Sequence, residues 1–258
     1  MLLENKVAII TGIGPGLGQE LAYTFAREGA SVAICCRREA ELARVSAEVE
    51  AQGGNVLALS TDVTDRAACK RFVDATVERF GRVDALVNSA YNPGSFALFE
   101  DANLDDWRGP LEVNLFGALN MIQEVVPHLK TAGGGAICNI NSQIHKKPMP
   151  YQGSYGTSKA ALEGATKFLA KELGAHKIRV NSVFMGWMWG PPVEGYVEGA
   201  AQGGVTRDQI IANITKDIAL GEIPDDSDCA NAVAFLCSDY ARVITGAGLD
   251  VNGGEFMP

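Results

Sequence analysis

The sequence has no apolar run near the ~18 residues that a membrane-spanning helix needs. It also has no strongly basic segment: Arg37-Arg38 and Lys146-Lys147 are isolated pairs in a chain with a formal net charge of -9. The strand-like segment 7-11 follows the first residues directly, without a basic leader or a cleavage site. We therefore expect a cytoplasmic protein with no membrane association and no nucleic-acid partner.

None of the six cysteines is spaced as C-x-x-C, which argues against zinc or thioredoxin-like chemistry. A chain of 258 residues does not need disulfides for stability, so we expect most cysteines to be small buried apolar side chains. We see no linker, repeat or low-complexity segment and expect a single domain over residues 1-258.

Short apolar segments alternate with amphipathic segments along the chain. Expected strands cover 7-11, 31-36, 55-60, 83-87, 135-141, 178-184 and 247-251. Expected helices cover 17-29, 38-52, 65-80, 104-130, 153-174, 206-219 and 226-238. This alternation predicts an α/β fold: a doubly wound parallel sheet of about seven strands with helices on both faces, as in Rossmann domains.

Residues 185-205 interrupt this alternation. They hold six glycines, two prolines and several large aromatic residues, without a clear period. We expect a functional loop here, and a substrate lid over about 185-215. Residues 206-209 have the pattern of a capping box that starts the next helix.

A glycine-rich turn follows the first strand and leads into the first helix. Such a turn lets the backbone approach a pyrophosphate, which the helix N-terminus then attracts. The expected cofactor contacts are Gly12, Gly14, Gly16, Leu17 and Gly18. The alternative is an ordinary tight connection between strand and helix.

The end of the second strand indicates which dinucleotide binds. An NAD enzyme usually has an acidic residue there, but this chain has Cys36 followed by Arg37 and Arg38. Guanidinium groups suit a 2′-phosphate, so the sequence favours NADP(H), with NAD(H) possible. Asp62, after the third strand, is expected either to contact the adenine or to cap the next helix.

Tyr155 and Lys159 are one helical turn apart on the same face of an expected helix. A nearby ammonium group can lower the pKa of a tyrosine and so allow acid/base chemistry. Ser142 ends the fifth strand, where its hydroxyl can reach a reacting oxygen. Asn114 is unusual inside a helix and has either a functional role or the role of a satisfied buried amide.

The chain resembles the short-chain dehydrogenase/reductases over essentially all of its length. The motifs that carry the resemblance are T-G-x-x-x-G-x-G at 11-18, Asp62-Val63, Asn88-Ser89-Ala90, Asn114, Ser142, Y-x-x-x-K at 155-159, Asn181-Ser182-Val183 and Asp250-Val251-Asn252-Gly253-Gly254.

The resemblance implies a catalytic tetrad. Tyr155 would be the general acid/base, and Ser142 would orient the substrate oxygen. Lys159 would bind the nicotinamide ribose and lower the tyrosine pKa, while Asn114 would hold a relay water. Further implied cofactor contacts are Val63, Asn88, Ala90, Gly186 and Met188. The tail at about 244-258 would build a homotetramer.

Three positions depart from the family pattern: Tyr91 and Met185 replace the usual glycine and proline, and Gly190 replaces a threonine that contacts the carboxamide. Tyr91, Met149, Trp187 and Trp189 are expected to line the substrate site together with Ser142 and Tyr155. This set predicts a bulky apolar ketone or alcohol as substrate, directed by polar groups only at its reacting oxygen.

The remaining polar residues near Ser142 have simpler interpretations. We do not expect His145 to be the base, and Lys146-Lys147 are expected in a solvated loop or, alternatively, as a handle for an acidic substrate. Two other functions stay open: an NAD(H)-dependent alcohol dehydrogenase and a catalytically silent, dinucleotide-binding redox sensor. An enoyl reductase is disfavoured, because that branch of the family spaces its tyrosine and lysine more widely.

Overall fold

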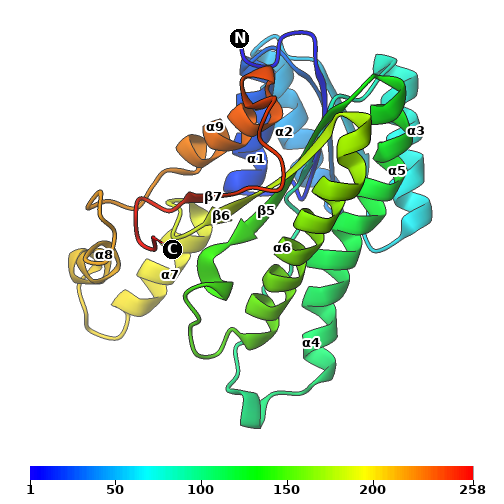
Figure 1. Ribbon diagram of the computed structural model, residues 1–258. Coiled ribbons are helices and arrows are strands. Elements are labelled where there is room, and N and C mark those ends of the chain that lie inside the picture. Colours follow the sequence, from blue (N-terminus) through cyan, green and yellow to red (C-terminus); the bar gives the residue numbers. More distant parts are fainter. Residues whose placement is uncertain (258) are drawn as a thin grey trace.

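The computed structural model describes residues 1–257, and its centre is one parallel seven-stranded sheet (Figure 1). The strand order is β3-β2-β1-β4-β5-β6-β7. The strands are β1 Val7–Thr11, β2 Ser31–Cys36, β3 Val56–Ser60, β4 Ala85–Asn88, β5 Gly135–Ser142, β6 Ile178–Met185 and β7 Gly248–Val251. The predicted doubly wound α/β fold is therefore confirmed, with each strand within two residues of its expected bounds.

The order of the strands reverses beside β1. The chain first builds outward from β1 to β3 and then returns to pair β4 with the free side of β1. The connections after β1 and β4 leave in opposite directions and open a crevice at the carboxyl ends of the strands. The glycine-rich turn, after Thr11, and the segment after Asn88 meet at this crevice.

Helices cover both faces of the sheet, as Figure 1 shows. They are α1 Leu17–Arg27, α2 Glu39–Ala51, α3 Arg66–Phe80, α4 Asp105–Pro110, α5 Ala118–Thr131, α6 Gly153–Leu173, α7 Pro191–Ala201, α8 Arg207–Thr215 and α9 Asp226–Cys237. One buried cluster joins α1, α2 and α9 to the sheet, and a second joins α3, α5 and α6 to the other face.

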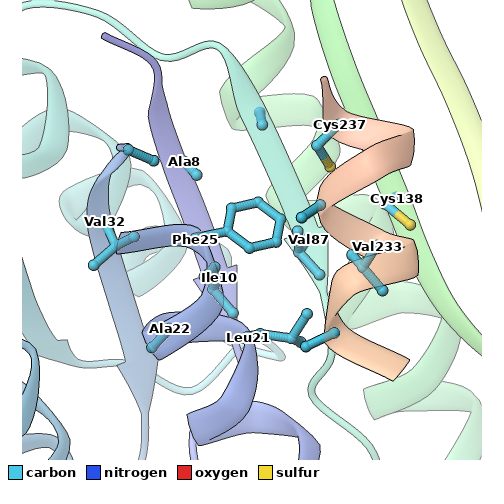
Figure 2. Close-up of a cluster of buried hydrophobic side chains, with 14 of the residues drawn as sticks. Ala8, Ile10, Leu21, Ala22, Phe25, Val32, Val87, Cys138, Val233 and Cys237 are labelled. Atoms are coloured by element: carbon cyan, nitrogen blue, oxygen red, sulfur yellow. The ribbon is translucent and has the colours of Figure 1, made fainter. Parts of the chain in front are cut away.

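The first cluster is drawn in Figure 2, where Phe25 of α1 lies between the sheet and α9. Its neighbours include Ile10 of β1 and Val233 of α9, all fully buried. Two cysteines, Cys138 and Cys237, pack as apolar side chains in this cluster. Five of the six cysteines are buried and all six are free, as the sequence predicted.

The fourth crossover helix is not regular throughout. A π-helical segment, Leu111–Gly117, joins α4 to α5. Pro110 ends α4, and Asn114 lies at the centre of the π-helical segment. Such segments are frequent at functional sites. The expected helix 104-130 therefore exists, with a local change of helical type that hydrophobic periodicity does not reveal.

The aperiodic segment 185-205 contains a helix that the sequence did not predict. Pro191 and Pro192 occupy the first positions of α7, where a missing N–H has no cost. Val197 of α7 packs with Ile210 and Ile214 of α8 in a small third cluster. The predicted capping box at 206-209 is present at the start of α8. None of the helices described for residues 1–257 is long and apolar enough to cross a membrane.

Candidate active site

A cavity of about 940 Å³ lies at the carboxyl ends of the strands. The glycine-rich turn and the ends of β2 and β3 form one part of its wall. The end of β5, the start of α6 and the segment after β6 form another part. The expected cofactor and catalytic ends of the sequence therefore share one cavity, and its volume suits small-molecule binding.

The glycine-rich turn packs tightly against the segment after β4. Gly12 has a positive φ of 79°, and a Cβ there would collide with the backbone of Ser89 and Ala90. Gly16, with φ 94°, precedes α1, whose N-terminus has no side-chain cap. Leu17 and Gly18 line the cavity at this N-terminus. A close backbone approach beside an uncapped helix start suits a pyrophosphate.

Both arginines after β2 line the cavity, but they lie differently. Nη2 of Arg38 is 2.7 Å from the position that a Cβ would take on Gly14. The side chain of Arg37 is exposed, with a guanidinium nitrogen 4.0 Å from a carboxylate oxygen of Asp62. Asp62 accepts hydrogen bonds from Thr64, whereas Asp65 caps α3. Asp62 therefore lies in the cavity wall and does not cap the helix.

Ser142 and Tyr155 meet where β5 ends and α6 begins, and both line the cavity. Burial raises the pKa of Tyr155 to about 12, although a hydrogen bond with Ser142 lowers it in part. Ser142 Oγ also lies 3.4 Å from the carbonyl oxygen of Met185 at the end of β6. The protein groups therefore keep the phenol protonated near neutral pH.

Lys159 lies close to Tyr155 on α6 and is fully enclosed by the protein. Its ammonium nitrogen lies 5.7 Å from the centre of the Tyr155 ring and donates a 2.7 Å hydrogen bond to the carbonyl of Ile140. Burial lowers the pKa of Lys159 itself to about 7. The two pKa shifts have the same physical cause, because burial disfavours the charged form of each group.

Asn114 and Asn88 lie behind the cavity wall. Asn114 Nδ2 donates to Ser158 Oγ at 2.8 Å, and its Oδ1 accepts from the backbone N–H of Asn92 at 2.6 Å. Asn88 donates to Asn139 at 2.9 Å and so links β4 to β5. The side chain of Asn114 thus holds the segment after β4 against α6, and neither asparagine lines the cavity.

The other expected cofactor contacts, Val63, Ala90, Gly186 and Met188, line the cavity. Of the expected substrate contacts, Tyr91, Met149 and Trp187 line it as well. Trp189 does not: it packs in the small cluster with α7 and α8, and the guanidinium of Arg207 lies 5.3 Å from its ring. Trp189 therefore packs this segment onto the protein, which corrects the expectation for that residue.

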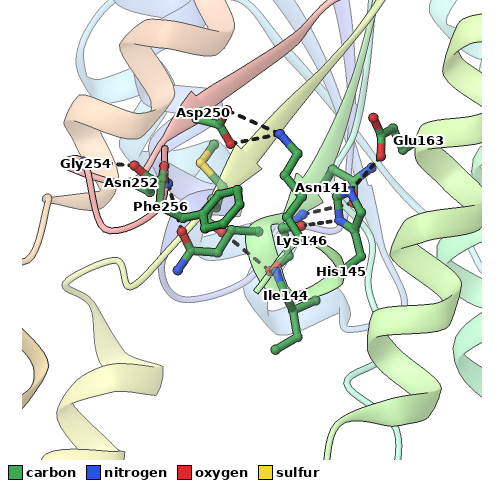
Figure 3. A network of polar contacts seen from close by, with 12 residues as sticks. Asn141, Ile144, His145, Lys146, Glu163, Asp250, Asn252, Gly254 and Phe256 are labelled. Atoms are coloured by element: carbon green, nitrogen blue, oxygen red, sulfur yellow. Dashed lines mark hydrogen bonds and ion pairs between the residues drawn. The ribbon is translucent and has the colours of Figure 1, made fainter. Parts of the chain in front are cut away.

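The sequence predicted a solvated loop after Ser142, but the charged residues there form pairs with other side chains (Figure 3). Nδ1 of His145 lies 2.7 Å from the carbonyl oxygen of Ser142, and its Nε2 lies 2.6 Å from a carboxylate oxygen of Glu163. Lys146 pairs with Asp250 at 3.1 Å. Lys147 lines the cavity and pairs with Glu255 at 3.2 Å. His145 is outside the cavity wall, in agreement with its non-catalytic interpretation.

Two acidic residues in the wall were not found by sequence reasoning. Asp226, at the start of α9, lies with one carboxylate oxygen 3.1 Å from the position of a Cβ on Gly16. Burial raises its pKa to about 7, and the nearby carboxylates Glu20, Asp225 and Glu194 add to the shift. Glu255 lies close to the C-terminus. No local sequence motif marks either residue as part of a site. The fold alone brings them to the cavity, from distant parts of the chain.

Comparisons with known proteins agree with this geometry. A family model described as "Enoyl-(Acyl carrier protein) reductase" matches residues 12–255. A solved short-chain type dehydrogenase/reductase from Mycobacterium ulcerans has a TM-score of 0.90 at 28% identity, covering 99% of this chain and 91% of that one. The chain belongs to the short-chain dehydrogenase/reductase family. It is therefore an oxidoreductase of a family whose members act on CH–OH or carbonyl groups.

Its relatives within the short-chain dehydrogenase/reductases have different substrates. A 3-oxoacyl-(acyl-carrier-protein) reductase of Thermotoga maritima is 35% identical over 98% of this chain and 99% of its own length. A 2,5-dichloro-2,5-cyclohexadiene-1,4-diol dehydrogenase of Sphingobium indicum is also 35% identical, over 98% of this chain and 96% of its own. A solved NAD⁺-bound xylitol dehydrogenase, 30% identical, has a TM-score of 0.91, covering 98% of this chain and all of that one.

Proposed function

We propose that this member of the family is an NADP(H)-dependent oxidoreductase that interconverts a carbonyl and a secondary alcohol. The observation that carries the proposal is the placement of Ser142 and Tyr155 in the same cavity as the glycine-rich turn. The dinucleotide supplies the hydride when it is bound. The protein supplies the binding surface and the proton.

The wall of the cavity fits a dinucleotide. The turn at Gly12 leaves no room for a side chain, and the uncapped start of α1 offers free N–H groups. Arg37 and Arg38 would hold a 2′-phosphate, which supports NADP(H). NAD(H) is the alternative, and the NAD⁺-bound xylitol dehydrogenase is the observation in its favour.

The proton would move between Tyr155 and the reacting oxygen. A phenol with a pKa of about 12 is protonated at neutral pH, which is the form needed to reduce a carbonyl. Ser142, which lines the same cavity, would orient the same oxygen. Lys159 would bind the ribose beside Tyr155. Asn114 uses its side-chain amide inside the protein, which leaves only its backbone for a role in proton relay.

The proposed substrate is bulky and has a mainly apolar body, which Tyr91, Met149 and Trp187 would contact. The expectation that polar groups act only at the reacting oxygen needs correction. Further polar side chains line the cavity, among them Asn92, Gln143, Lys147 and Gln152. The substrate is therefore proposed to be apolar in its body but not throughout.

Two other activities predict different results. An enoyl reductase would consume NADPH with a 2-enoyl thioester, and a silent sensor would bind NADPH without any turnover. The spacing of four between Tyr155 and Lys159 and the complete Ser142–Tyr155 pair argue against them.

The proposed function is tested by following NADPH and NADH oxidation at 340 nm with cyclic ketones, 2-alkanones and a 2-enoyl thioester. We expect ketone reduction, faster with NADPH. Reduction of the thioester alone would contradict the proposal, as would the absence of turnover with every carbonyl compound despite tight NADPH binding.

A further inference from the structure

Glu255 has a buried carboxylate oxygen that no described residue satisfies. Its side chain is 6% exposed and lines the cavity. Oε1 accepts a 3.2 Å hydrogen bond from Lys147 Nζ, but Oε2 has no partner among residues 1–257. A buried acceptor without a donor is unfavourable. This oxygen therefore needs a donor that the fold does not provide.

The unsatisfied oxygen lies close to the reacting end of the cavity. Oε2 is 2.8 Å from the position that a Cβ would take on Gly186, which also lines the cavity. Gly186 directly follows Met185, whose carbonyl oxygen lies 3.4 Å from Ser142 Oγ. Because Gly186 has no side chain, Oε2 is not covered from that direction. The residue beside Glu255 Oε2 and the residue beside Ser142 Oγ are therefore consecutive in the chain.

Gln143 adds a donor to the same place. Its Oε1 accepts a 2.8 Å hydrogen bond from Asn252 and lies 3.2 Å from the same Cβ position on Gly186. No partner for its Nε2 is found within the described part of the chain. The end of the cavity beside Ser142 thus offers one carboxylate acceptor and one amide donor.

We propose that Glu255 and Gln143 bind a second hydroxyl group of the substrate, so that the enzyme prefers a hydroxy ketone, or the corresponding diol, to a simple ketone or alcohol. This inference rests on the proposed function and specifies its substrate class. A hydroxyl group can donate to the carboxylate and accept from the amide at once. A methylene group at this place would leave Oε2 without a donor, and a site of this kind rejects the analogue that lacks the polar group.

The test compares substrates that differ by one hydroxyl. The wild-type enzyme is assayed with NADPH on cyclohexanone and 2-hydroxycyclohexanone, and with NADP⁺ on cyclohexanol and 1,2-cyclohexanediol. We expect kcat/KM to be at least about tenfold higher for the hydroxylated member of each pair. Glu255→Gln should reduce this ratio to within about threefold, mainly through a higher KM for the hydroxylated member of each pair. Glu100→Gln, at an exposed position outside the cavity, is the matched control.

The outcomes separate this inference from the proposed function. Turnover of cyclohexanone with no preference for its hydroxylated form would overturn the inference alone. A change in the Kd of NADPH on Glu255→Gln, with an unchanged substrate ratio, would overturn it too, because Glu255 would then serve the cofactor.

If no substrate of either kind is turned over, the proposed function fails. Calorimetric titration of cyclohexanol and 1,2-cyclohexanediol into the protein with NADP⁺ then decides the inference: equal affinities refute it, and tighter diol binding supports it. The wild-type comparisons remain valid even if the variant does not fold.

Discussion

The guanidinium of Arg38 lies against Gly14, with Nη2 2.7 Å from the position that a Cβ would occupy on that glycine. A side chain at position 14 would displace the arginine from the cavity wall. The glycine-rich turn thus does more than admit a pyrophosphate: it also leaves room for a cation between the first helix and the end of β2.

This relationship yields a prediction about cofactor choice. NADPH should bind more tightly than NADH, and Arg38→Ala should weaken NADPH binding by about ten- to a hundredfold, because a charge-assisted contact with the 2′-phosphate is lost. Arg37→Ala should also weaken it, while NADH binding changes little in both variants. Fluorescence titration of the wild type and of both variants with each cofactor measures these dissociation constants. Arg71→Ala, at an exposed position of α3, is the control. Equal Kd values of the wild type for NADPH and NADH would contradict the prediction.

A second prediction concerns the proton donor. Tyr155→Phe keeps the ring but removes the hydroxyl, so kcat should fall by about 10²–10⁴ or more while the Kd of NADPH stays nearly unchanged. Tyr151→Phe, at an exposed position of the preceding segment, should behave as wild type. Retained turnover in Tyr155→Phe would place the acid elsewhere. His145 is a poor substitute, since both of its ring nitrogens are already bonded within the protein.

The sequence predicted the sheet well because each strand is a short apolar segment bounded by turn residues. It predicted less where two structures share one pattern: the π-helical segment around Asn114 has the same apolar spacing as an α-helix. It also could not separate Trp187 from Trp189: both pack against the small cluster, but Trp187 also lines the cavity and Trp189 does not. The pair Lys147–Glu255 spans 108 residues, and only the fold brings it together.

A third prediction follows from Asp226 and concerns stability. Its pKa is raised to about 7 in the folded protein from a usual value near 3.8. Between about pH 4 and pH 7 the folded state therefore holds a proton that the unfolded state has lost, and stability falls as pH rises through this window. Above it, the folded protein carries a buried carboxylate among other acidic groups.

Asp226→Asn removes that charge without changing the shape of the side chain. We expect its Tm to exceed that of the wild type by several degrees at pH 8, with a difference that shrinks toward pH 5. Thermal unfolding followed by circular dichroism at both pH values measures it. Asp228→Asn, an exposed residue of the same first turn, controls for the lost interaction with the helix N-terminus. An equal effect of the two variants at pH 8 would contradict the prediction.

The fourth prediction separates the two tryptophans of the segment after β6. Each buried CH₂ adds about 0.8 kcal/mol of affinity, so kcat/KM should rise a few-fold per carbon from 2-butanone to longer 2-alkanones until the cavity is full. Trp187→Ala should flatten this rise, because Trp187 lines the cavity. Trp189→Ala should lower Tm and keep the rise, since Trp189 packs against α7 and α8. A flat series in the wild type would show that the aromatic residues serve packing alone.

The last prediction concerns assembly. β7 is one of the two edge strands of the sheet, and an unprotected edge favours pairing with another chain. Large apolar side chains are exposed before, within and after this strand: Val243 is 87% exposed, Leu249 37% and Met257 75%. We expect a homotetramer with two-fold axes, in which residues 244-258 are buried between copies.

Sedimentation velocity at micromolar concentration should give a single species of four chains. Leu249→Asp, which places a charge on the edge strand, should shift it to smaller species, whereas Leu220→Asp, on an exposed turn, should leave it intact. A wild-type monomer under these conditions would exclude the tetramer, and the exposed edge would then need another explanation.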